Sequence, residues 1–231
     1  MTRIRSLAPW LLVMTLVFAP PSMANPVLDF TDGAAFDPID LAGEFGGKVG
    51  PITLGWAFTL SAPITVNALG LFDVDGDGLA GEHGLGLWTS GGSLLALATI
   101  SDANSSPVGS TSSLGNWRFT AIVPLVLAAG EYVIGAGYAV SNSTNSTGFG
   151  DQFVADATVS TAPGVTFDEA RFGPGFGFPL NSTFILPDGF FGPNLSAVPF
   201  AGVAEPASLL LLGTGLAGLT GLAAWRARRR R

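Results

Sequence analysis

The 231-residue sequence contains no cysteine and a single histidine, and these scarcities exclude several kinds of chemistry. Without cysteine the chain has no disulfide framework, no thiol nucleophile and no Cys-ligated metal. Any Ser-His-Asp triad would have to use His83, and zinc cannot assemble on one His without Cys. The chain also lacks a Gly-x-Ser-x-Gly elbow. We therefore expect a protein that is not an enzyme, with His83 as a residue of a flexible acidic loop.

Basic residues are scarce in the middle of the chain. Between Asn25 and Val203 only Lys48, Arg118 and Arg171 stand against sixteen Asp and Glu, a net charge of −13. This stretch has no basic patch for phosphates or anionic lipid, so nucleic acid is excluded as a partner. Divalent cations, cationic polymers or simply water are the expected surroundings of such an acidic surface.

The first 24 residues have the three parts of a secretory signal peptide. Arg3 and Arg5 precede an apolar run from Leu7 to Ala19, and Ser22-Met23-Ala24 is a small-x-small cleavage site. We expect export through the Sec machinery and removal of residues 1–24. Residues 25–203 then form one exported domain with a sizeable core.

The C-terminal region, residues 204–231, has a different three-part order. The motif Ala204-Glu205-Pro206 comes first, and residues 207–224 follow without a charge. A helix of this length crosses about 27 Å of hydrocarbon, which predicts a single transmembrane helix. Five arginines end the chain: Arg226, Arg228, Arg229, Arg230 and Arg231. Their position places the C-terminus in the cytoplasm and everything before Ala204 outside.

This order of motif, apolar helix and arginine cluster resembles the PEP-CTERM sorting signal of Gram-negative bacteria, from Val203 to Arg231. The resemblance implies recognition by an exosortase, a membrane-embedded transpeptidase that cleaves near the motif so that the protein leaves the inner membrane for the cell surface. The usual Pro-Glu-Pro reads Ala204-Glu205-Pro206 here, which relaxes the extended conformation that the first Pro imposes. An ordinary single-pass anchor, which would keep its helix, is the alternative.

The sequence of the exported part is typical of short β-strands. No segment keeps a helical period for three turns, and apolar runs alternate with Gly, Pro, Ser and Asn. The predicted strands are Ile52–Leu60, Ile64–Phe72, Leu85–Thr89, Leu94–Ile100, Asn116–Val123 and Tyr132–Val140. Ser90-Gly91-Gly92 predicts a hairpin between the third and fourth, and we expect the last two to pair through Pro124 to Glu131. The pattern predicts an all-β fold, an antiparallel β-sandwich of jelly-roll or immunoglobulin-like type.

Part of this stretch, from Thr53 to Tyr138, is similar to the DUF4082-type β-sandwich carried by PEP-CTERM proteins. Its best matches are the hairpin around Trp88 and the turn from Leu127 to Tyr132. The resemblance implies architecture, with no assigned chemistry.

The segment from Pro163 to Pro193 is rich in Gly, Pro and Phe and is expected to be irregular. Its seven Phe either plug the core or form an exposed aromatic surface for sugar rings.

One acidic motif could bind a metal. Asp73, Asp75 and Asp77 precede Gly78 at the spacing of the first half of an EF-hand loop, but Gly84 stands where that loop needs a bidentate Glu. The alternatives are a weak calcium loop and a plain Asp/Gly-rich turn.

Two functions follow from these observations. The first is a surface or matrix protein, sorted by its tail and associated with extracellular polysaccharide and biofilm. The second is a calcium-assisted carbohydrate-binding module that stacks sugar rings on Trp56, Trp88 and Trp117.

Overall fold

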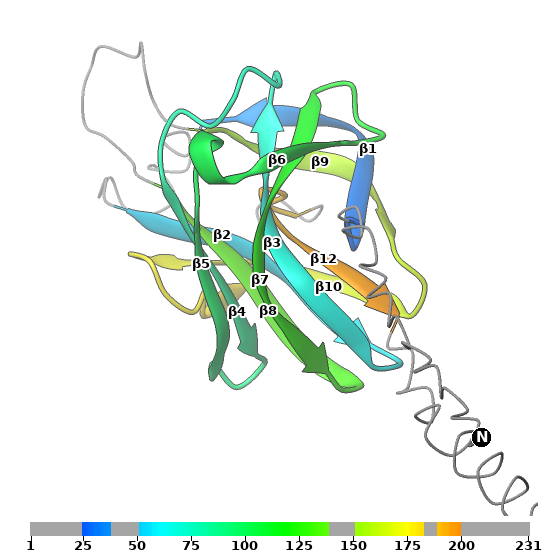
Figure 1. Cartoon of the computed structure of the whole chain (residues 1–231). Coiled ribbons are helices and arrows are strands. Elements are labelled where there is room, and N and C mark those ends of the chain that lie inside the picture. The colour runs from blue at the N-terminus through cyan, green and yellow to red at the C-terminus, as the bar shows by residue number, and fades with distance from the viewer. Residues whose placement is uncertain (1–24, 38–50, 139–150, 183–188, 200–231) are drawn as a thin grey trace, which may run out of the picture.

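The computed structural model describes residues 25–37, 51–138, 151–182 and 189–199, which form an all-β fold (Figure 1). Apart from the 3-10 turn η2 (Asp102–Asn104), every regular element in these ranges is a strand. The strands are β1 (Leu28–Phe36), β2 (Ile52–Leu60), β3 (Ile64–Val74), β4 (His83–Thr89), β5 (Leu94–Ile100), β6 (Ser106–Gly109), β7 (Gly115–Leu127), β8 (Gly130–Tyr138), β9 (Phe153–Thr161), β10 (Val165–Pro174), β11 (Asn181–Ser182) and β12 (Pro193–Pro199).

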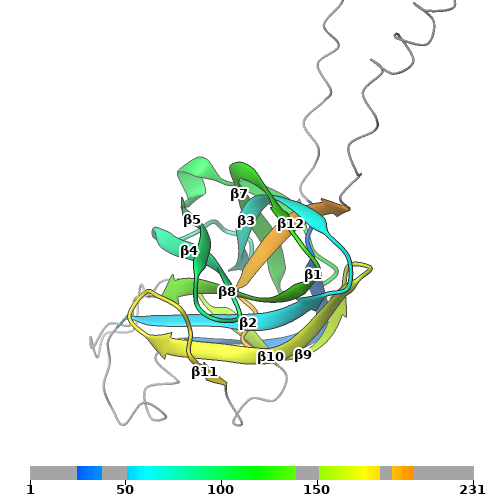
Figure 2. The same cartoon turned by 90° about the horizontal axis from the view of Figure 1, so that it is seen from below.

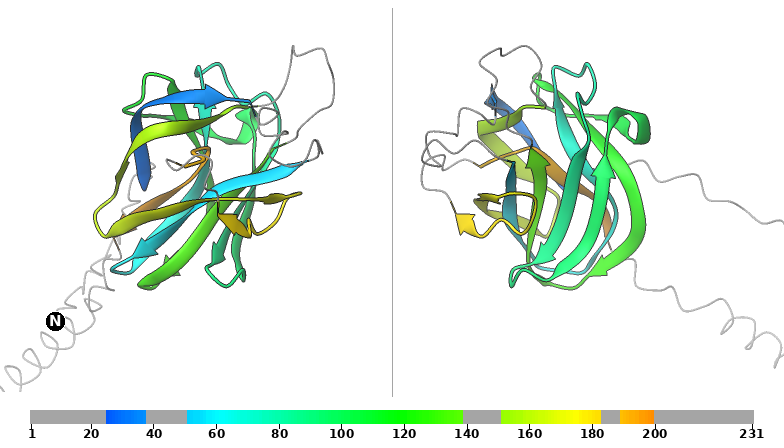
Figure 3. Two further views of the ribbon diagram at one scale, coloured as in Figure 1. Left: turned by 180° about the vertical axis from the view of Figure 1, so that it is seen from behind. Right: turned by 90° about the vertical axis from the view of Figure 1, so that its left-hand side faces the viewer.

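The strands form three antiparallel sheets, an arrangement consistent with a β-sandwich. One sheet has six strands in the order β11-β10-β2-β8-β4-β5, and a second has four in the order β12-β3-β7-β6. Figure 2 shows β2, β8 and β10 in one layer and β3, β7 and β12 in the other. The remaining pair, β1 and β9, forms a ribbon that lies across one end of these two sheets (Figure 3).

The hydrophobic core lies between the two larger sheets. β2 crosses the middle of the six-stranded sheet, and Leu54, Trp56, Phe58 and Leu60 are buried on one of its faces, as their alternation predicts. The indole of Trp56 donates a hydrogen bond to the carbonyl of Pro193, 2.7 Å away on β12. This bond joins the six-stranded sheet to the four-stranded one and satisfies a polar group that burial would otherwise leave unpaired.

The β1–β9 ribbon closes the core through one aromatic residue. Phe30 of β1 is fully buried, and its ring centroid lies 4.8 Å from that of Phe72 and 5.5 Å from that of Trp117. Beside it, the carboxylate of Asp29 accepts hydrogen bonds from Trp117 Nε1, from Ser110 Oγ, and from both the backbone N–H and the hydroxyl of Thr111. The ring of Phe30 and the carboxylate of Asp29 thus both contact β7, and Asp29 also binds the loop before β7. These contacts fix the ribbon in place.

The first and last described residues lie next to each other. Pro26 bridges Ser196, the N–H of Val27 bonds the carbonyl of Leu195, and the N–H of Ala197 bonds the carbonyl of Asn25. The buried amide of Asn194 adds two bonds to the backbone of Leu28. Residues 1–24 and 200–231 therefore attach to the fold at adjacent points, which lie at one end of the body (Figures 1 and 2).

Several of the strand predictions hold and others need correction. β2, β5 and the β4–β5 hairpin are confirmed. The predicted pairing of Asn116–Val123 with Tyr132–Val140 is wrong, because β7 pairs with β3 and β6 while β8 pairs with β2 and β4. Pro124 to Leu127 belong to β7 itself, so Ala128 and Ala129 carry the chain from one sheet to the other.

The expectation of irregular structure from Pro163 to Pro193 is also wrong in its first part. Val165 to Pro174 forms β10 and pairs along the whole of β2. Its only proline is the last residue of the strand, where a missing N–H costs no interior bond of the ladder. The predicted signal peptide, the Ala204-Glu205-Pro206 motif, the 207–224 helix and the C-terminal arginines lie outside the described residues. Among the residues that are described, no helix is long and apolar enough to cross a membrane.

The Asp29 junction gives a first prediction. Burial opposes the ionisation of Asp29, but its hydrogen bonds from Ser110, Trp117 and Thr111 together outweigh that cost and hold the pKa below its usual value. The stability that Asp29 contributes is therefore present above pH 3.8 and lost as the pH falls through the lowered value. We expect Asp29→Asn to lower the free energy of unfolding by about 1–2 kcal/mol at pH 7, since donors then face an amide on a partly exposed group.

Urea unfolding at pH 7 and pH 3 measures this cost. Asp32→Asn, an exposed change on the same strand at a positive φ that Asn tolerates, is the matched control. An equal effect of the two changes, or an undiminished effect of Asp29→Asn at pH 3, would contradict this account.

Candidate functional site

The acidic loop between β3 and β4 is the candidate site, and it begins inside the fold. Asp73 is the last but one residue of β3 and is 1% exposed. Its carboxylate accepts a hydrogen bond from Arg118 Nε at 2.7 Å and from the backbone N–H of Gly78 at 3.2 Å. Arg118 also pairs with Asp102 at 2.6 Å. Asp73 therefore holds the loop closed, and Arg118 already balances its charge.

Asp75 and Asp77 stand at the exposed tip of the same loop. Asp75 has φ 69°, a left-handed conformation that Asp tolerates better than most residues, and its Oδ1 accepts the N–H of Asp77 at 3.1 Å. One carboxylate oxygen each of Asp73, Asp75 and Asp77 lie within 4.8 Å of one another. The structure thus brings together all three residues that the motif singles out.

Among the residues that the structure describes, no basic side chain forms an ion pair with Asp75 or Asp77. A hydrogen bond with Asp75 and the charge of Asp75 raise the pKa of Asp77, with smaller contributions from burial, Asp73 and Asp151. A carboxyl whose pKa is raised by like charges binds a proton, or a cation in its place, more readily than an isolated one. The loop tip is therefore a site where a hard cation would relieve repulsion.

The loop lines a pocket together with residues that no local sequence motif marks. The pocket has a volume of about 310 Å³, and Asp75 and Asp77 are among the residues that line it. Asp37, which follows β1, and Asp151 and Gln152, which precede β9, line the same pocket. These three residues lie more than 30 positions from the loop in sequence, and no local motif marks them. Their common feature is that the β1–β9 ribbon brings them to this end of the body.

The prediction that His83 is a residue of a flexible acidic loop is wrong. His83 is the first residue of β4, is 4% exposed and packs edge-on against the ring of Tyr138. Its Nδ1 donates to the carbonyl of Gly137 at 2.8 Å, and its Nε2 lies 2.6 Å from Oδ2 of Asp151. A carbonyl oxygen only accepts, so Nδ1 carries the proton of the first bond, and Nε2 lies within hydrogen-bond distance of a carboxylate oxygen. Both ring nitrogens are therefore engaged.

Asp151 connects the ion pair to the acidic loop. Its other oxygen accepts the backbone N–H of Ala80 at 3.2 Å, so one carboxylate ties the end of the loop to the start of β4. Burial, and next the charge of Asp151, raise the pKa of the Tyr138 phenol, which stays neutral. His83, Tyr138 and Asp151 thus form a buried cluster, and of these three residues Asp151 also lines the pocket.

The three tryptophans do not form a surface for sugar rings, and that prediction is corrected here. Trp56 and Trp117 are fully buried in the core, and Trp88 is 5% exposed. Trp88 lies on the outer face of the six-stranded sheet, where a Cβ on Gly86 would come within 2.1 Å of its ring. Phe176 and Phe178 cover it, with ring centroids 6.4 Å and 6.1 Å away. Stacking on a sugar needs an open ring face, and none of the three has one.

The phenylalanines between Pro163 and Pro193 divide between core and surface. Phe190 and Phe191 are buried in the core, and Phe167 and Phe172 pack against it. Phe176 is 46% exposed and lies over Gly84 and Gly137 on the outer face. Most of these rings are thus core plugs, which is one of the two readings that the sequence leaves open.

Comparison of the chain with protein-family models, with curated proteins and with solved structures finds no match.

The His83–Asp151 pair gives a second prediction. Both side chains are 5% exposed, and breaking a buried ion pair on one side costs about 3–5 kcal/mol because the other charge loses its partner. We expect His83→Gln and Asp151→Asn each to lower the free energy of unfolding strongly, and the double variant to cost less than the sum of the two. Urea unfolding of the four proteins in a double-mutant cycle measures the coupling, which we expect to exceed about 1 kcal/mol.

Asp156→Asn serves as the control, because Asp156 is an exposed aspartate of β9. Strict additivity of His83→Gln and Asp151→Asn would show that the pair is not coupled.

Proposed function

We propose that this protein is a non-catalytic β-sandwich of jelly-roll or immunoglobulin-like type that an exosortase sorts through its C-terminal tail. It is exported by the Sec machinery and anchored for a time in the inner membrane. It then reaches the cell surface or the extracellular matrix, where it associates with exopolysaccharide and contributes to biofilm. The similarity of residues 53–138 to DUF4082-type sandwiches of sorted proteins agrees with this role.

The observation that carries the proposal is the order of parts at the C-terminus. Glu205-Pro206, an uncharged stretch long enough for one membrane crossing and five arginines follow each other within 27 residues. A buried core helix has no need of the flanking arginines, and a secreted domain has no need of the apolar stretch.

The geometry of the described residues supports this reading. Asn25 lies beside Ala197, two residues before the end of β12, so a membrane segment attached after β12 would leave the rest of the fold projecting away. The strong excess of acidic residues in the exported part suits a well-hydrated matrix.

The surroundings of His83 support the absence of catalysis. A general base must offer a free nitrogen to the proton of a nucleophile. Here Nδ1 is bound to Gly137 and Nε2 to Asp151, so neither nitrogen of the only histidine faces an open site.

The sorting proposal predicts where the mature chain ends. In a strain that carries an exosortase, we expect the protein from the surface fraction to lack residues 207–231 and to begin at Asn25, because both terminal segments are removed. Mass spectrometry of the intact protein gives both ends at once.

We expect Glu205→Ala to leave the full-length chain in the inner-membrane fraction, and Glu82→Ala, a change at an exposed glutamate, to leave sorting unaltered. Surface protein that keeps its arginine cluster would favour an ordinary membrane anchor.

Calcium-assisted carbohydrate binding is the second candidate, and the acidic pocket is the observation that favours it. Three carboxylates of one loop converge within 4.8 Å, and Asp37 and Asp151 line the same pocket. Oxygen ligands of this kind suit calcium, and extracellular sites need only Kd values of about 0.1–1 mM. With the tryptophans buried, a sugar would bind here through its hydroxyl groups on the ion.

Calcium binding predicts a shift of the melting temperature. If the Kd is about 1 mM, 10 mM calcium stabilises the fold by about 1.4 kcal/mol, which raises Tm by roughly 3–5 °C over a sample with chelator. The shift should shrink as the pH falls, because protons compete at Asp77, whose pKa is raised. Differential scanning calorimetry measures it.

The double variant Asp75→Asn, Asp77→Asn should abolish the calcium shift, and Asp156→Asn should keep it, since Asp156 is exposed and far from the loop in sequence. A wild-type protein whose Tm is the same in calcium and in chelator would remove this candidate.

A further inference from the structure

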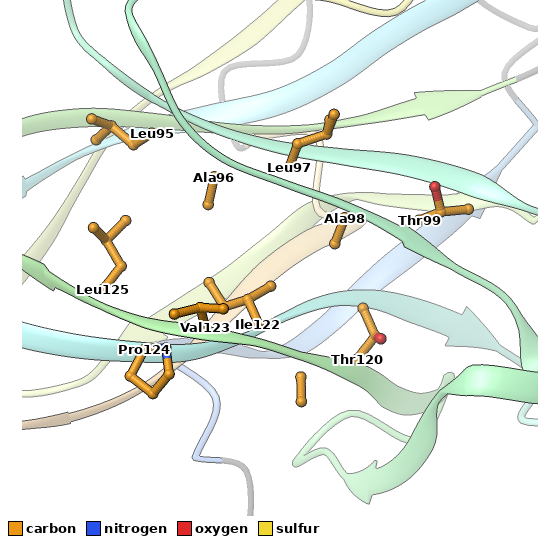
Figure 4. A pocket seen from close by; sticks show the side chains of 11 residues that line it. Leu95, Ala96, Leu97, Ala98, Thr99, Thr120, Ile122, Val123, Pro124 and Leu125 are labelled. Carbon is orange, nitrogen blue, oxygen red and sulfur yellow. The ribbon is translucent and has the colours of Figure 1, made fainter.

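One side of the sandwich is an open groove between the two larger sheets, lined mostly by apolar side chains and by exposed backbone. The groove has a volume of about 510 Å³ and runs between β5 and the second half of β7. Figure 4 shows Ala96 and Ala98 of β5 pointing towards β7 and Leu125 of β7 lying between the two strands. Large apolar side chains along the groove are exposed to water: Leu97 is 58% exposed and Val123 is 87% exposed.

Both strands present unpaired backbone at this groove. Within the part of the chain that the structure describes, β5 is the last strand of its sheet and pairs only with β4. β6 covers β7 only over residues 116–119, so residues 120–127 have no partner on that side. A row of free N–H and C=O groups is a template for another strand.

The two edges differ in how they are protected. Natural edges are blunted by charges, by proline or by bulges. The free edge of β7 contains Pro124, which has no N–H to donate. β5 reads Leu-Leu-Ala-Leu-Ala-Thr-Ile, without a charge or a proline, and its one register shift lies at its start, beside Trp88. β5 is therefore the edge that is ready to pair.

The charge of the exported part indicates which partner pairs with the edge of β5. The exported part has a net charge of −13, so two copies repel each other wherever carboxylates meet. β5 and residues 120–127 together contain no charged side chain, so two copies that meet along β5 bring no carboxylates of these strands together. A cationic partner would instead be drawn to the acidic pocket at the β3–β4 loop.

We infer that β5 pairs with β5 of a second copy of this chain in an antiparallel two-fold dimer. A two-fold axis makes two identical strands antiparallel, which matches every pairing in the sheet. The axis passes through Leu97, the middle residue of the strand, so that all seven residues find a partner. Leu97 then faces Leu97 of the second copy, and Ala96 faces Ala98. The dimer joins the two six-stranded sheets into one and brings the exposed Leu97 side chains of the two copies against each other.

This dimer does not depend on the sorting proposal, because it rests on β5 and on the charge of residues 25–203, and neither involves the C-terminal tail. A homotypic contact of this kind links neighbouring copies wherever the protein accumulates.

A cysteine cross-link tests the register directly, because the chain has no cysteine of its own. Directly opposed residues of antiparallel strands have Cα atoms about 4.5–5.5 Å apart, which is within the range that a disulfide spans. We expect full-length Leu97→Cys, purified in mild detergent and treated with a mild added oxidant, to form a disulfide-linked dimer at least tenfold faster than Leu180→Cys. Leu180 is 71% exposed and precedes β11, at the opposite edge of the same sheet.

A charged substitution on β5 tests whether this strand forms the dimer. Sedimentation of the full-length chain in the same detergent measures the result. Leu97→Lys places two lysines against each other on the axis and should convert the dimer into a monomer, whereas Leu180→Lys should leave it intact. Near-ultraviolet circular dichroism checks that both variants keep the native packing.

A monomeric wild-type protein, a dimer that Leu97→Lys leaves unchanged, or equal cross-linking rates of the two cysteine variants would each overturn the inference. The second of these results would place self-association on another part of the chain. Wild-type monomers that pair β5 with an added apolar peptide would assign the edge to a different extended partner.

Discussion

The packing of Phe30 against Phe72 and Trp117 is the contact on which the rest of this structure depends. It fixes β1 across one end of the two larger sheets, in a chain that has no cysteine to close the core covalently. Asp29 and the buried amide of Asn194 hold the same strand through hydrogen bonds to β7, its preceding loop and β12. Because β1 spans nine residues, or about 30 Å, it links two distant places. Asn25 at its start meets β12, and Asp37 after its end lines the acidic pocket.

The acidic pocket combines a structural half and an open half. Asp73 and Asp151 are each committed, one to Arg118 and the other to His83, and together they shape the loop and its junction with β4. Asp75 and Asp77 have no such basic partner among the described contacts, and the hydrogen bond with Asp75, together with the charge of Asp75, raises the pKa of Asp77. The same loop is thus held by hydrogen bonds and an ion pair at its base, whereas its tip carries two exposed carboxylates.

Local patterns in the sequence predict the parts of this fold that depend on neighbouring residues. The alternation of Leu54, Trp56, Phe58 and Leu60 predicts β2, and Gly91-Gly92 predicts the β4–β5 hairpin, because in both cases the cause lies within ten residues. β1, β9 and β10 mix polar and apolar residues and acquire their strand character from partners more than 100 positions away. The pairing of β7 with β3 instead of β8 likewise depends on which sheet each strand joins. No short-range signal carries that choice.

The residues of the candidate site likewise divide into those that a local sequence pattern predicts and those that only the tertiary structure brings together. Asp73, Asp75 and Asp77 could be found from their spacing, whereas Asp37 and Asp151 reach the pocket only through the tertiary course of the β1–β9 ribbon. His83 stands between Glu82 and Gly84, a context typical of a loop, and its burial depends on Asp151, 68 positions later. Trp56, Trp88 and Trp117 look like sugar platforms by residue type alone. Their burial depends on neighbours such as Phe176, which a linear reading cannot place over Trp88.

The adjacency of Asn25 and Ala197 has a mechanical consequence. A force applied at Pro199 and directed along β12 acts on a strand that has seven residues paired with β3. The hydrogen bonds between these two strands then share the load in shear. Asn25 to Val27 lie against the same strand and add hydrogen bonds from the other side. The point where the body would be pulled is therefore held on both flanks, and the acidic pocket, at the far end of β1, stays out of the path of the force.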